Sequence, residues 1–244
     1  MYHVEGRNPV LEILRHRHVR KVLLAKGVEE GPKISEIIEL ARERGVPVVS
    51  LPRERLDRDS KTGRHQGVMA LMEPLPQSSL LEILSQGSKE TCFVLLNKIQ
   101  DPQNLGAILR TAEASGVNAI IVPKRGSVGL TPAVIRASMG GAFYVPLMVE
   151  RLFPAIKLLR DEGVRIIGVD PRGSVDYHEV RLTGSVAFVL GGEGRGISQE
   201  LLSKCDNVVR IPMKGRISSL NVGVAVAVVL YERLRQLKVL EGTR

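Results

Sequence analysis

The sequence predicts an α/β fold in two unequal parts, and three observations support this prediction. Apolar runs typical of strands alternate with segments of helical spacing along residues 91–230. Shorter segments of the same kinds occur in residues 1–72. Between the two parts, residues 73–79 contain two prolines with polar neighbours, which is typical of a linker. We therefore expect a first domain over 1–72, a linker over 73–88 and a second domain over 89–244.

Within the first part, the pattern predicts a small α/β unit. Asn8 followed by Pro9 is typical of a helix N-cap with proline at the first helical position, so a helix is expected through Leu14. A second helix is expected from Lys33, and Gly45 marks where it ends. Short strands are expected at Val19–Ala25, Val46–Leu51 and Gly67–Met72.

In the second part, strand candidates alternate with helix candidates. The strands are expected at Cys92–Leu96, Ala119–Val122, Arg165–Val169, Val186–Leu190 and Val208–Ile211. The helices are expected at Leu105–Ser115, Pro132–Met139, Leu152–Asp161 and Ile197–Cys205. This alternation predicts a mostly parallel sheet with helices on both faces. In such sheets, ligands bind where loops leave the carboxyl ends of the strands.

Charge and composition narrow the choice of partner. The chain has 244 residues, with 35 lysines and arginines against 26 acidic residues, so its formal net charge is +9. This surplus favours a polyanionic partner, although a protein that is merely positive is the alternative. Aromatic residues make up 3% of the chain and do not cluster. If the partner is RNA, we therefore expect phosphate contacts rather than stacking of bases on aromatic side chains.

The cysteines and the apolar segments indicate the compartment. Cys92 and Cys205 are the two cysteines, which excludes a disulfide framework and a multi-cysteine zinc site and fits a reducing compartment. No metal is expected. The longest apolar stretch, around Val222 to Tyr231, is shorter than the ~20 residues of a membrane span, and the first residues lack a secretory segment. We expect a soluble, cytoplasmic protein with no membrane partner.

The first candidate loop follows the strand expected at Cys92–Leu96. Asp101 or Asn104 is suited to cap the helix that starts there. Arg110 lies off the apolar stripe of that helix. For these residues alone, a capped helix with a solvated arginine is the simpler interpretation.

The second candidate loop, Gly191–Gly196, has four glycines in six positions directly after a strand. Such a loop suggests a close approach of the backbone to a ligand. It is not a P-loop, because no lysine followed by serine or threonine ends it. It also fails the dinucleotide fingerprint, because Ile197 stands where the third glycine is required. A flexible turn is the alternative, but that does not explain Glu193 among the glycines.

The third candidate loop, Ile211–Asn221, leads into a long final helix. Ser219 or Asn221 is suited to cap that helix, so capping explains one of the two polar residues and not both. The valines up to Val229 leave strand and helix open by periodicity alone. They lie on more than one side of a helix, so one core face cannot bury them all, and we predict a homodimer through this helix.

Together, the three loops resemble, in their usual order, the three motifs of the SpoU, or TrmH-like, family of RNA ribose 2′-O-methyltransferases. The residues that carry this resemblance are Asn104 with Arg110, the Gly191–Gly196 loop with Glu193, and Ile211–Asn221. Two N-terminal segments, Val4–Val10 and His65–Val68, resemble the substrate domain of the RlmB branch, which methylates a guanosine of large-subunit ribosomal RNA. The resemblance implies a trefoil-knotted methyltransferase domain, a small N-terminal RNA-binding domain, S-adenosylmethionine as cofactor, and a dimer with the site near the subunit boundary.

The resemblance also implies roles for individual residues. The implied catalytic residues are Arg110, Asn104, Glu193, Ser219 and Asn221. The implied cofactor contacts are Gly191, Gly192, Ile211, Met213 and Leu220. Because a guanidinium stays protonated in proteins, we expect Arg110 to bind the substrate phosphate and stabilise the developing 2′-oxyanion rather than act as a base. The residues expected to contact RNA phosphates are Arg15, Arg17, Arg20 and Lys21.

Other classes of function remain as alternatives. A tRNA ribose methyltransferase is one, although that branch usually lacks the N-terminal domain. A non-catalytic RNA-binding ribosome factor is another, although such a protein has no reason to keep all five implied catalytic residue types. A doubly wound nucleotide-binding enzyme is a third, and the failed glycine fingerprint counts against it.

Overall fold

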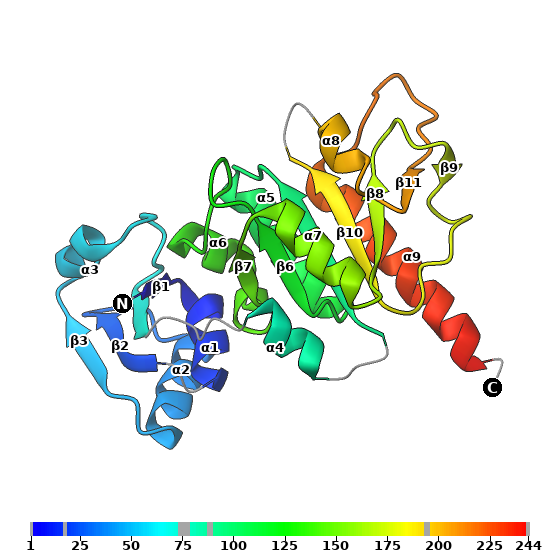
Figure 1. The fold of residues 1–244 in the computed structure, drawn as a ribbon. Helices are drawn as coiled ribbons and strands as arrows, with labels where there is room; N and C mark the ends of the chain where they lie inside the picture. Colours follow the sequence, from blue (N-terminus) through cyan, green and yellow to red (C-terminus); the bar gives the residue numbers. More distant parts are fainter. Residues whose placement is uncertain (1, 17–18, 73–78, 87–89, 193–195, 243–244) are drawn as a thin grey trace.

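The computed structural model describes residues 2–16, 19–72, 79–86, 90–192 and 196–242. Figure 1 shows two sheets, one in the N-terminal part and one in the C-terminal part, each packed against helices. The predicted α/β fold is confirmed. Within the described ranges, no helix is both long enough and apolar enough to cross a membrane.

The first sheet has four strands in the order β1-β4-β2-β3. β4 runs antiparallel to β1 and β2, whereas β2 and β3 are parallel. Its strands are β1 (Tyr2–Glu5), β2 (Val19–Ala25), β3 (Val48–Leu51) and β4 (Val68–Met72). Its helices are α1 (Arg7–His16), α2 (Pro32–Glu43) and α3 (Arg53–Asp59).

Three details of this first part differ from the sequence-based expectation. α1 already begins at Arg7, so Asn8 is not its cap; the Asn8 amide oxygen instead accepts a hydrogen bond from Lys33 Nζ at 2.6 Å. β1 was not predicted, because Tyr2–Glu5 contains no apolar run. α3 was not predicted either, because Leu56 is the sole apolar residue in its seven and gives no helical period.

A helix also lies inside the predicted linker, where α4 spans Leu80–Ser85. Ser79 and Glu82 form a capping box: Ser79 N donates to Glu82 Oε2 at 2.7 Å, and Glu82 N donates to Ser79 Oγ at 3.2 Å. Leu80 and Ile83 are buried against the second sheet. Residues 73–78 and 87–88 of the predicted linker lie outside the described residues.

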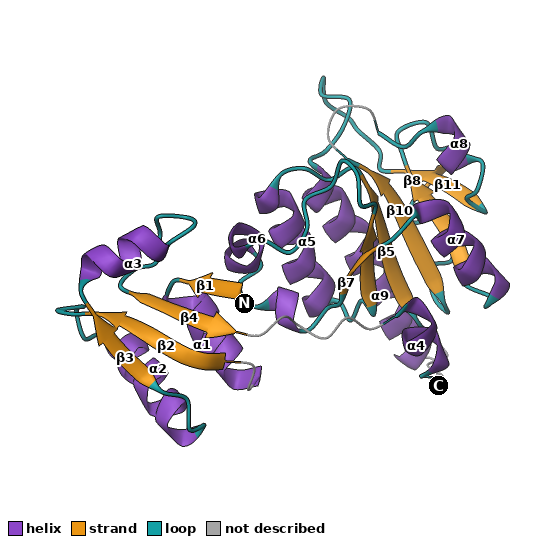
Figure 2. Ribbon diagram, turned by 60° about the vertical axis from the view of Figure 1, so that its left-hand side comes forward, coloured by secondary structure: helices purple, strands orange, loops and turns teal. Residues whose placement is uncertain are grey.

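The second sheet has seven strands, and every pair of neighbours is parallel, in the order β7-β6-β5-β10-β8-β11-β9 (Figure 2). This confirms the predicted parallel sheet. Its strands are β5 (Cys92–Asn97), β6 (Ala119–Val122), β7 (Leu147–Val149), β8 (Arg165–Val169), β9 (Val175–Asp176), β10 (Val186–Gly191) and β11 (Asn207–Arg210). The helices after β5 are α5 (Pro102–Ala114), α6 (Pro132–Ala137), the 3-10 turn η1 (Gly141–Phe143), α7 (Leu152–Asp161), α8 (Gln199–Leu202) and α9 (Val222–Gly242).

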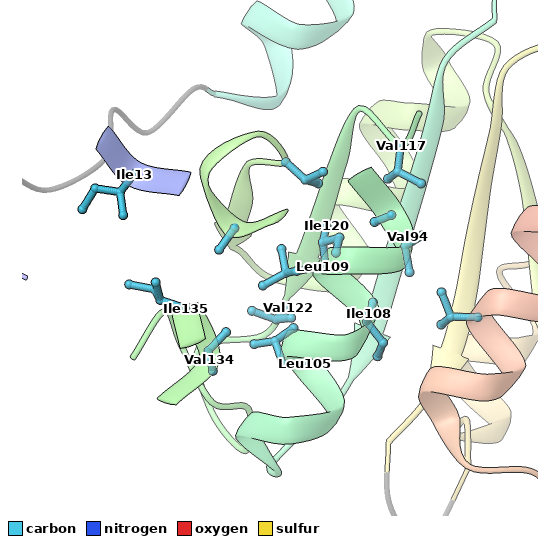
Figure 3. Close-up of a cluster of buried hydrophobic side chains, with 14 of the residues drawn as sticks. Ile13, Val94, Leu105, Ile108, Leu109, Val117, Ile120, Val122, Val134 and Ile135 are labelled. Atoms are coloured by element: carbon cyan, nitrogen blue, oxygen red, sulfur yellow. The ribbon is translucent and has the colours of Figure 1, made fainter. Parts of the chain in front are cut away.

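Helices cover both faces of this sheet, as predicted. Alternate residues of β5 belong to two buried clusters: Val94 and Leu96 face α5, α6 and α9, whereas Phe93 and Leu95 face α4, α7 and α8. Figure 3 shows the first cluster, in which the apolar stripe of α5 points at the sheet. The same cluster includes Ile13 of α1, so the core is continuous between the two parts of the chain.

A polar contact adds to this junction between the parts. Tyr144 Oη donates to Glu12 Oε2 at 3.4 Å. Gly140, at a φ of +102°, lets α1 approach closely, since a Cβ there would lie 2.7 Å from Cγ of Glu12. The first domain is therefore packed directly against the α6–η1 side of the second.

Candidate functional site

A pocket of about 570 Å³ opens where β8, β10 and β11 end and where α9 begins. This volume is within the range of roughly 300–1,000 Å³ that small-molecule sites have. The pocket lies at the carboxyl ends of parallel strands, where α/β folds bind ligands. Its lining residues are Val169–Arg172, Leu190–Gly192, Gly196, Ile211, Met213, Ser218–Val222 and Ala225.

The structure brings the implied cofactor contacts together in this pocket. They come from two loops, and all of them line it: Gly191, Gly192, Ile211, Met213 and Leu220. Two implied catalytic residues, Ser219 and Asn221, also line it. Glu193 lies outside the described residues.

Close packing of backbones explains two glycines of the second loop. A Cβ at Gly191 would lie 2.2 Å from the carbonyl carbon of Gly196. A Cβ at Gly192 would lie 1.9 Å from the carbonyl oxygen of Lys98. Neither distance is possible for a real side chain. Contact between protein segments is therefore already a sufficient reason for glycine here, whereas the sequence suggested the approach of a ligand.

A hydrogen bond joins the first and third loops. Asn221 Nδ2 donates to Asn104 Oδ1 at 2.9 Å, across 117 positions of the chain. Asn221 Oδ1 accepts from Gly223 N at 2.9 Å and from Val224 N at 3.4 Å. Because those backbone groups only donate, the oxygen must face them, which fixes the orientation of the amide. Asn221 is thus the cap of α9, while Asp101 caps α5 by accepting from Gln103 N at 2.8 Å.

Arg110 is the implied catalytic residue that the structure sets apart. It is exposed on α5 and is not among the pocket-lining residues. Its Cα packs against η1, since a Cβ at Gly141 would lie 2.9 Å from it. One turn earlier, exposed Ala107 adjoins the start of α9, where a Cβ at Gly223 would lie 3.8 Å from Ala107 Cβ. Arg110 therefore lies on an exposed face beside the α5–α9 contact.

The residues expected to contact RNA phosphates lie at the C-terminal end of α1 and the start of β2. Arg15 pairs with Glu12 and, at 3.4 Å, with Glu36. Arg20 and Lys21 are exposed on β2. Arg17 lies outside the described residues.

Sequence reasoning missed one side of the pocket, formed by Asp170 and Arg172. Arg172 Nε donates to Asp170 Oδ1 at 2.7 Å, and Arg172 Nη2 donates to Asp170 Oδ2 at 2.9 Å and to the Ile197 carbonyl at 2.6 Å. Burial raises the pKa of the Asp170 carboxyl, but the hydrogen bonds from Arg172 and Ile197 outweigh burial and lower that pKa overall. The pair ties the end of the glycine loop to β8. The sequence could have identified Asp170 as a candidate, because it directly follows a predicted strand.

The pocket suits a ligand with apolar and hydrogen-bonding parts. Leu190, Ile211 and Val222 supply apolar walls, while Ser218 and Ser219 bring hydroxyl groups. S-adenosylmethionine has this mixed character, so the residues present fit it. Among the described residues, no group of three or more histidines, cysteines and acidic residues could bind a metal ion.

Comparisons with known proteins identify the family of this chain. The model of the SpoU rRNA Methylase family matches residues 91–231, and the model named RNA 2′-O ribose methyltransferase substrate binding matches residues 3–78. A relative in Staphylococcus epidermidis, named as a TrmH family tRNA/rRNA methyltransferase, is 37% identical over 243 residues. That match covers 98% of this chain and 97% of the relative.

Solved structures show the same fold. The SpoU methyltransferase AviRb from Streptomyces viridochromogenes, in complex with AdoMet, is similar with a TM-score of 0.80 and 26% identity, over 97% of this chain and 90% of that chain. A structure described as concerning 2-OH methylation of C/U34 on tRNA is similar with a TM-score of 0.56 and 30% identity. It covers 62% of this chain, although the match takes in 99% of its own length.

Proposed function

Because this chain belongs to the SpoU rRNA methylase family, it is an S-adenosylmethionine-dependent RNA ribose 2′-O-methyltransferase, and we propose that its substrate is a guanosine of large-subunit ribosomal RNA. SpoU methyltransferases are of the trefoil-knot class, and the chain shares their fold over 97% of its length. The assignment to the RlmB branch is part of the proposal.

The N-terminal domain is the reason for proposing ribosomal RNA as the substrate. The similar structure concerned with tRNA matches 62% of this chain, about the share that residues 89–244 represent. That chain therefore has no counterpart to more than a third of this one. Residues 3–78 match a substrate-binding model instead, which supports a second surface for RNA on this chain. We propose the domain limits 1–72, 73–88 and 89–244, with Arg15, Arg17, Arg20 and Lys21 contacting RNA phosphates and with the protein acting in the cytoplasm.

The pocket residues divide into two proposed roles. Gly191, Gly192, Ile211, Met213 and Leu220 would bind S-adenosylmethionine, which supplies a methyl group activated on a sulfonium. Asn104, Glu193, Ser219 and Asn221 would position the ribose next to it. Positioning is a large part of catalysis in such a transfer, because the nucleophile and the methyl group must be brought into line. The Asn104–Asn221 hydrogen bond supports this role, since it fixes side chains from two loops in one orientation.

Arg110 would act at a subunit boundary. We propose a homodimer through the second domain, supported by α9: Val226 and Val229 are buried in the chain, whereas Val224 is 49% exposed and Tyr231 is 53% exposed. An exposed apolar face beside a buried one suits association with a second copy. Arg110 lies on the neighbouring exposed face of α5, where such a dimer would bring it near the boundary. There it would bind phosphate and stabilise the developing 2′-oxyanion.

Mapping of ribose methylation tests the substrate. Ribosomal RNA and tRNA would be isolated from cells with the gene, without it, and with a Gly191→Val variant that blocks the pocket. We expect one guanosine of large-subunit RNA to lose its 2′-O-methyl group in the second and third strains. Loss at a tRNA position, with ribosomal RNA unchanged, would contradict the proposal.

A further inference from the structure

Lys98 has a backbone conformation that residues with a Cβ rarely adopt. Its φ is +62°, and it is one of three non-glycine residues with positive φ in the part of the chain that is described. This left-handed region is unfavourable for a lysine and favours glycine. Non-glycine residues held in this region cluster at functional sites. A lysine in this conformation therefore indicates a function of its side chain that glycine could not perform.

Packing explains the turn at position 98 but not the lysine. Gly191 is paired with Asn97 in the sheet, and Gly192 N donates to the Asn97 carbonyl at 2.6 Å. The Lys98 carbonyl packs against Gly192, as described above. These contacts use only backbone atoms, and a glycine at position 98 would make them equally well without strain.

The side chain of Lys98 has a fixed starting direction. Its aliphatic stem lies over Gly126, where a Cβ would be 3.2 Å from Lys98 Cγ. The Gly126 loop is itself tied to the first loop, because Val128 N donates to the Ile99 carbonyl at 2.7 Å. Lys98 is thus placed between the glycine loop on one side and the loop after β6 on the other.

The positive charge of Lys98 is not paired with any group of the described residues. Its side chain is exposed and makes no ion pair or hydrogen bond with any described residue. Lys124 and Arg125, which immediately precede Gly126, are also exposed and without such partners among the described residues. Three cations therefore face solvent close to the glycine loop, and Gly191 and Gly192 of that loop line the pocket.

We propose that Lys98 is a substrate-positioning residue that binds a phosphate group of the RNA beside the cofactor pocket, with Lys124 and Arg125 extending the same positive surface. This rests on the proposed function, because it requires RNA to approach this pocket. A backbone phosphate is the favoured ligand, since the cations are exposed and Lys98 itself is not among the pocket-lining residues. The carboxylate of the cofactor is the competing ligand for this charge.

Three substitutions separate the charge from the backbone. Lys98→Gly removes the charge and the strain, Lys98→Gln removes the charge alone, and Lys98→Arg keeps the charge. Lys157→Ala is the matched control, since Lys157 is an exposed lysine on α7, a helix that contributes no residue to the pocket. The measurements are KM and kcat for methylation of a large-subunit RNA fragment, the Kd for S-adenosylmethionine, and Tm.

We expect Lys98→Gly and Lys98→Gln to raise the KM for RNA about tenfold, in keeping with loss of a charged hydrogen bond. The slope of log RNA affinity against log salt should fall by about one unit. The cofactor Kd and kcat should change less than about twofold, and Lys98→Arg should stay close to wild type. Lys98→Gly should also raise Tm by about 2 °C, so the variant that binds RNA worse is the more stable protein.

An unchanged KM for RNA in both neutral variants would overturn the inference. A change confined to the cofactor Kd would also overturn it, because Lys98 would then serve the cofactor. If Lys98→Gly proves less stable than wild type, Lys98→Gln still decides the role of the charge. Failure of the wild-type protein to methylate any RNA would instead count against the proposed function.

Discussion

Gly191→Ala is the substitution whose effect the structure defines most closely. The added Cβ would lie 2.2, 2.4 and 2.6 Å from three backbone atoms of Gly196. Since real Cβ contacts stay above 3.0 Å, one of the two backbone segments must move by up to about 1 Å. Gly196 is not free to yield, because the neighbouring Ile197 is tied to Asp170 and Arg172 through its N–H and carbonyl groups. Overpacking of this kind costs about 1–3 kcal/mol.

That strain should appear as lost cofactor affinity. Both segments line the pocket, so a loop that relaxes must be returned to its native position when the cofactor binds. A cost of about 1–3 kcal/mol corresponds to a Kd for S-adenosylmethionine about 5- to 150-fold higher, measured by calorimetry. Gly129→Ala is the control, since a Cβ there meets nothing within 4 Å and should leave the Kd unchanged. An unchanged Kd in the Gly191 variant would refute the assignment of this loop to the cofactor.

Three further predictions follow from single side chains. Asn221→Asp keeps an acceptor for the α9 cap but places a carboxylate oxygen against Asn104, so Tm should change little while methylation falls at least tenfold; equal activity would exclude a role for the pair. Arg110→Ala should lower single-turnover methylation about a hundredfold or more with cofactor affinity unchanged, and near-normal turnover would show that Arg110 is an ordinary surface residue. Glu5→Gln should destabilise the protein to urea at pH 7 and progressively less as the pH falls below about 4, and a pH-independent difference would contradict this.

The pH dependence of Glu5 follows from its contacts. Burial of the carboxyl raises its pKa, but hydrogen bonds from Ser60, Lys61 and Thr62 outweigh burial and lower the pKa below its ordinary value. The folded protein thus binds the Glu5 proton less readily than the unfolded chain does. The stabilisation is therefore fully present above the unfolded pKa of about 4.3 and is lost as pH falls through the folded pKa.

Long apolar runs made much of the fold predictable from sequence. β5 and β10 are buried on both faces, so Cys92–Leu96 and Val186–Leu190 are apolar throughout, and the stripe on α5 has a clear helical period. β7 and β9 were missed because two or three residues at the edges of a sheet carry no pattern. α9 was ambiguous in its valine-rich part, and its cap was identified only once Asn221 was seen beneath the first turn.

The site was predictable where it follows strands and only in part elsewhere. The three loops were found because glycine and capping residues come directly after apolar runs. The Asn104–Asn221 bond spans 117 positions, and no local pattern encodes such a contact. Asp170 and Arg172 were missed because Asp-Pro-Arg-Gly is also an ordinary turn sequence. The sequence identified the correct glycine-rich loop. It did not show why glycine is required there, because Gly191 packs against Gly196 and Gly192 packs against Lys98 only in the folded chain.

Nucleoside mass spectrometry after a reaction in vitro tests directly whether the protein methylates a guanosine of ribosomal RNA. Purified protein would be incubated with S-adenosylmethionine carrying a labelled methyl group and with unmodified large-subunit ribosomal RNA or total tRNA. We expect labelled 2′-O-methylguanosine from the ribosomal RNA, at one position, and none from the same reaction with Gly191→Val. Label on a base, label in tRNA alone, or equal label with the Gly191→Val protein would contradict it.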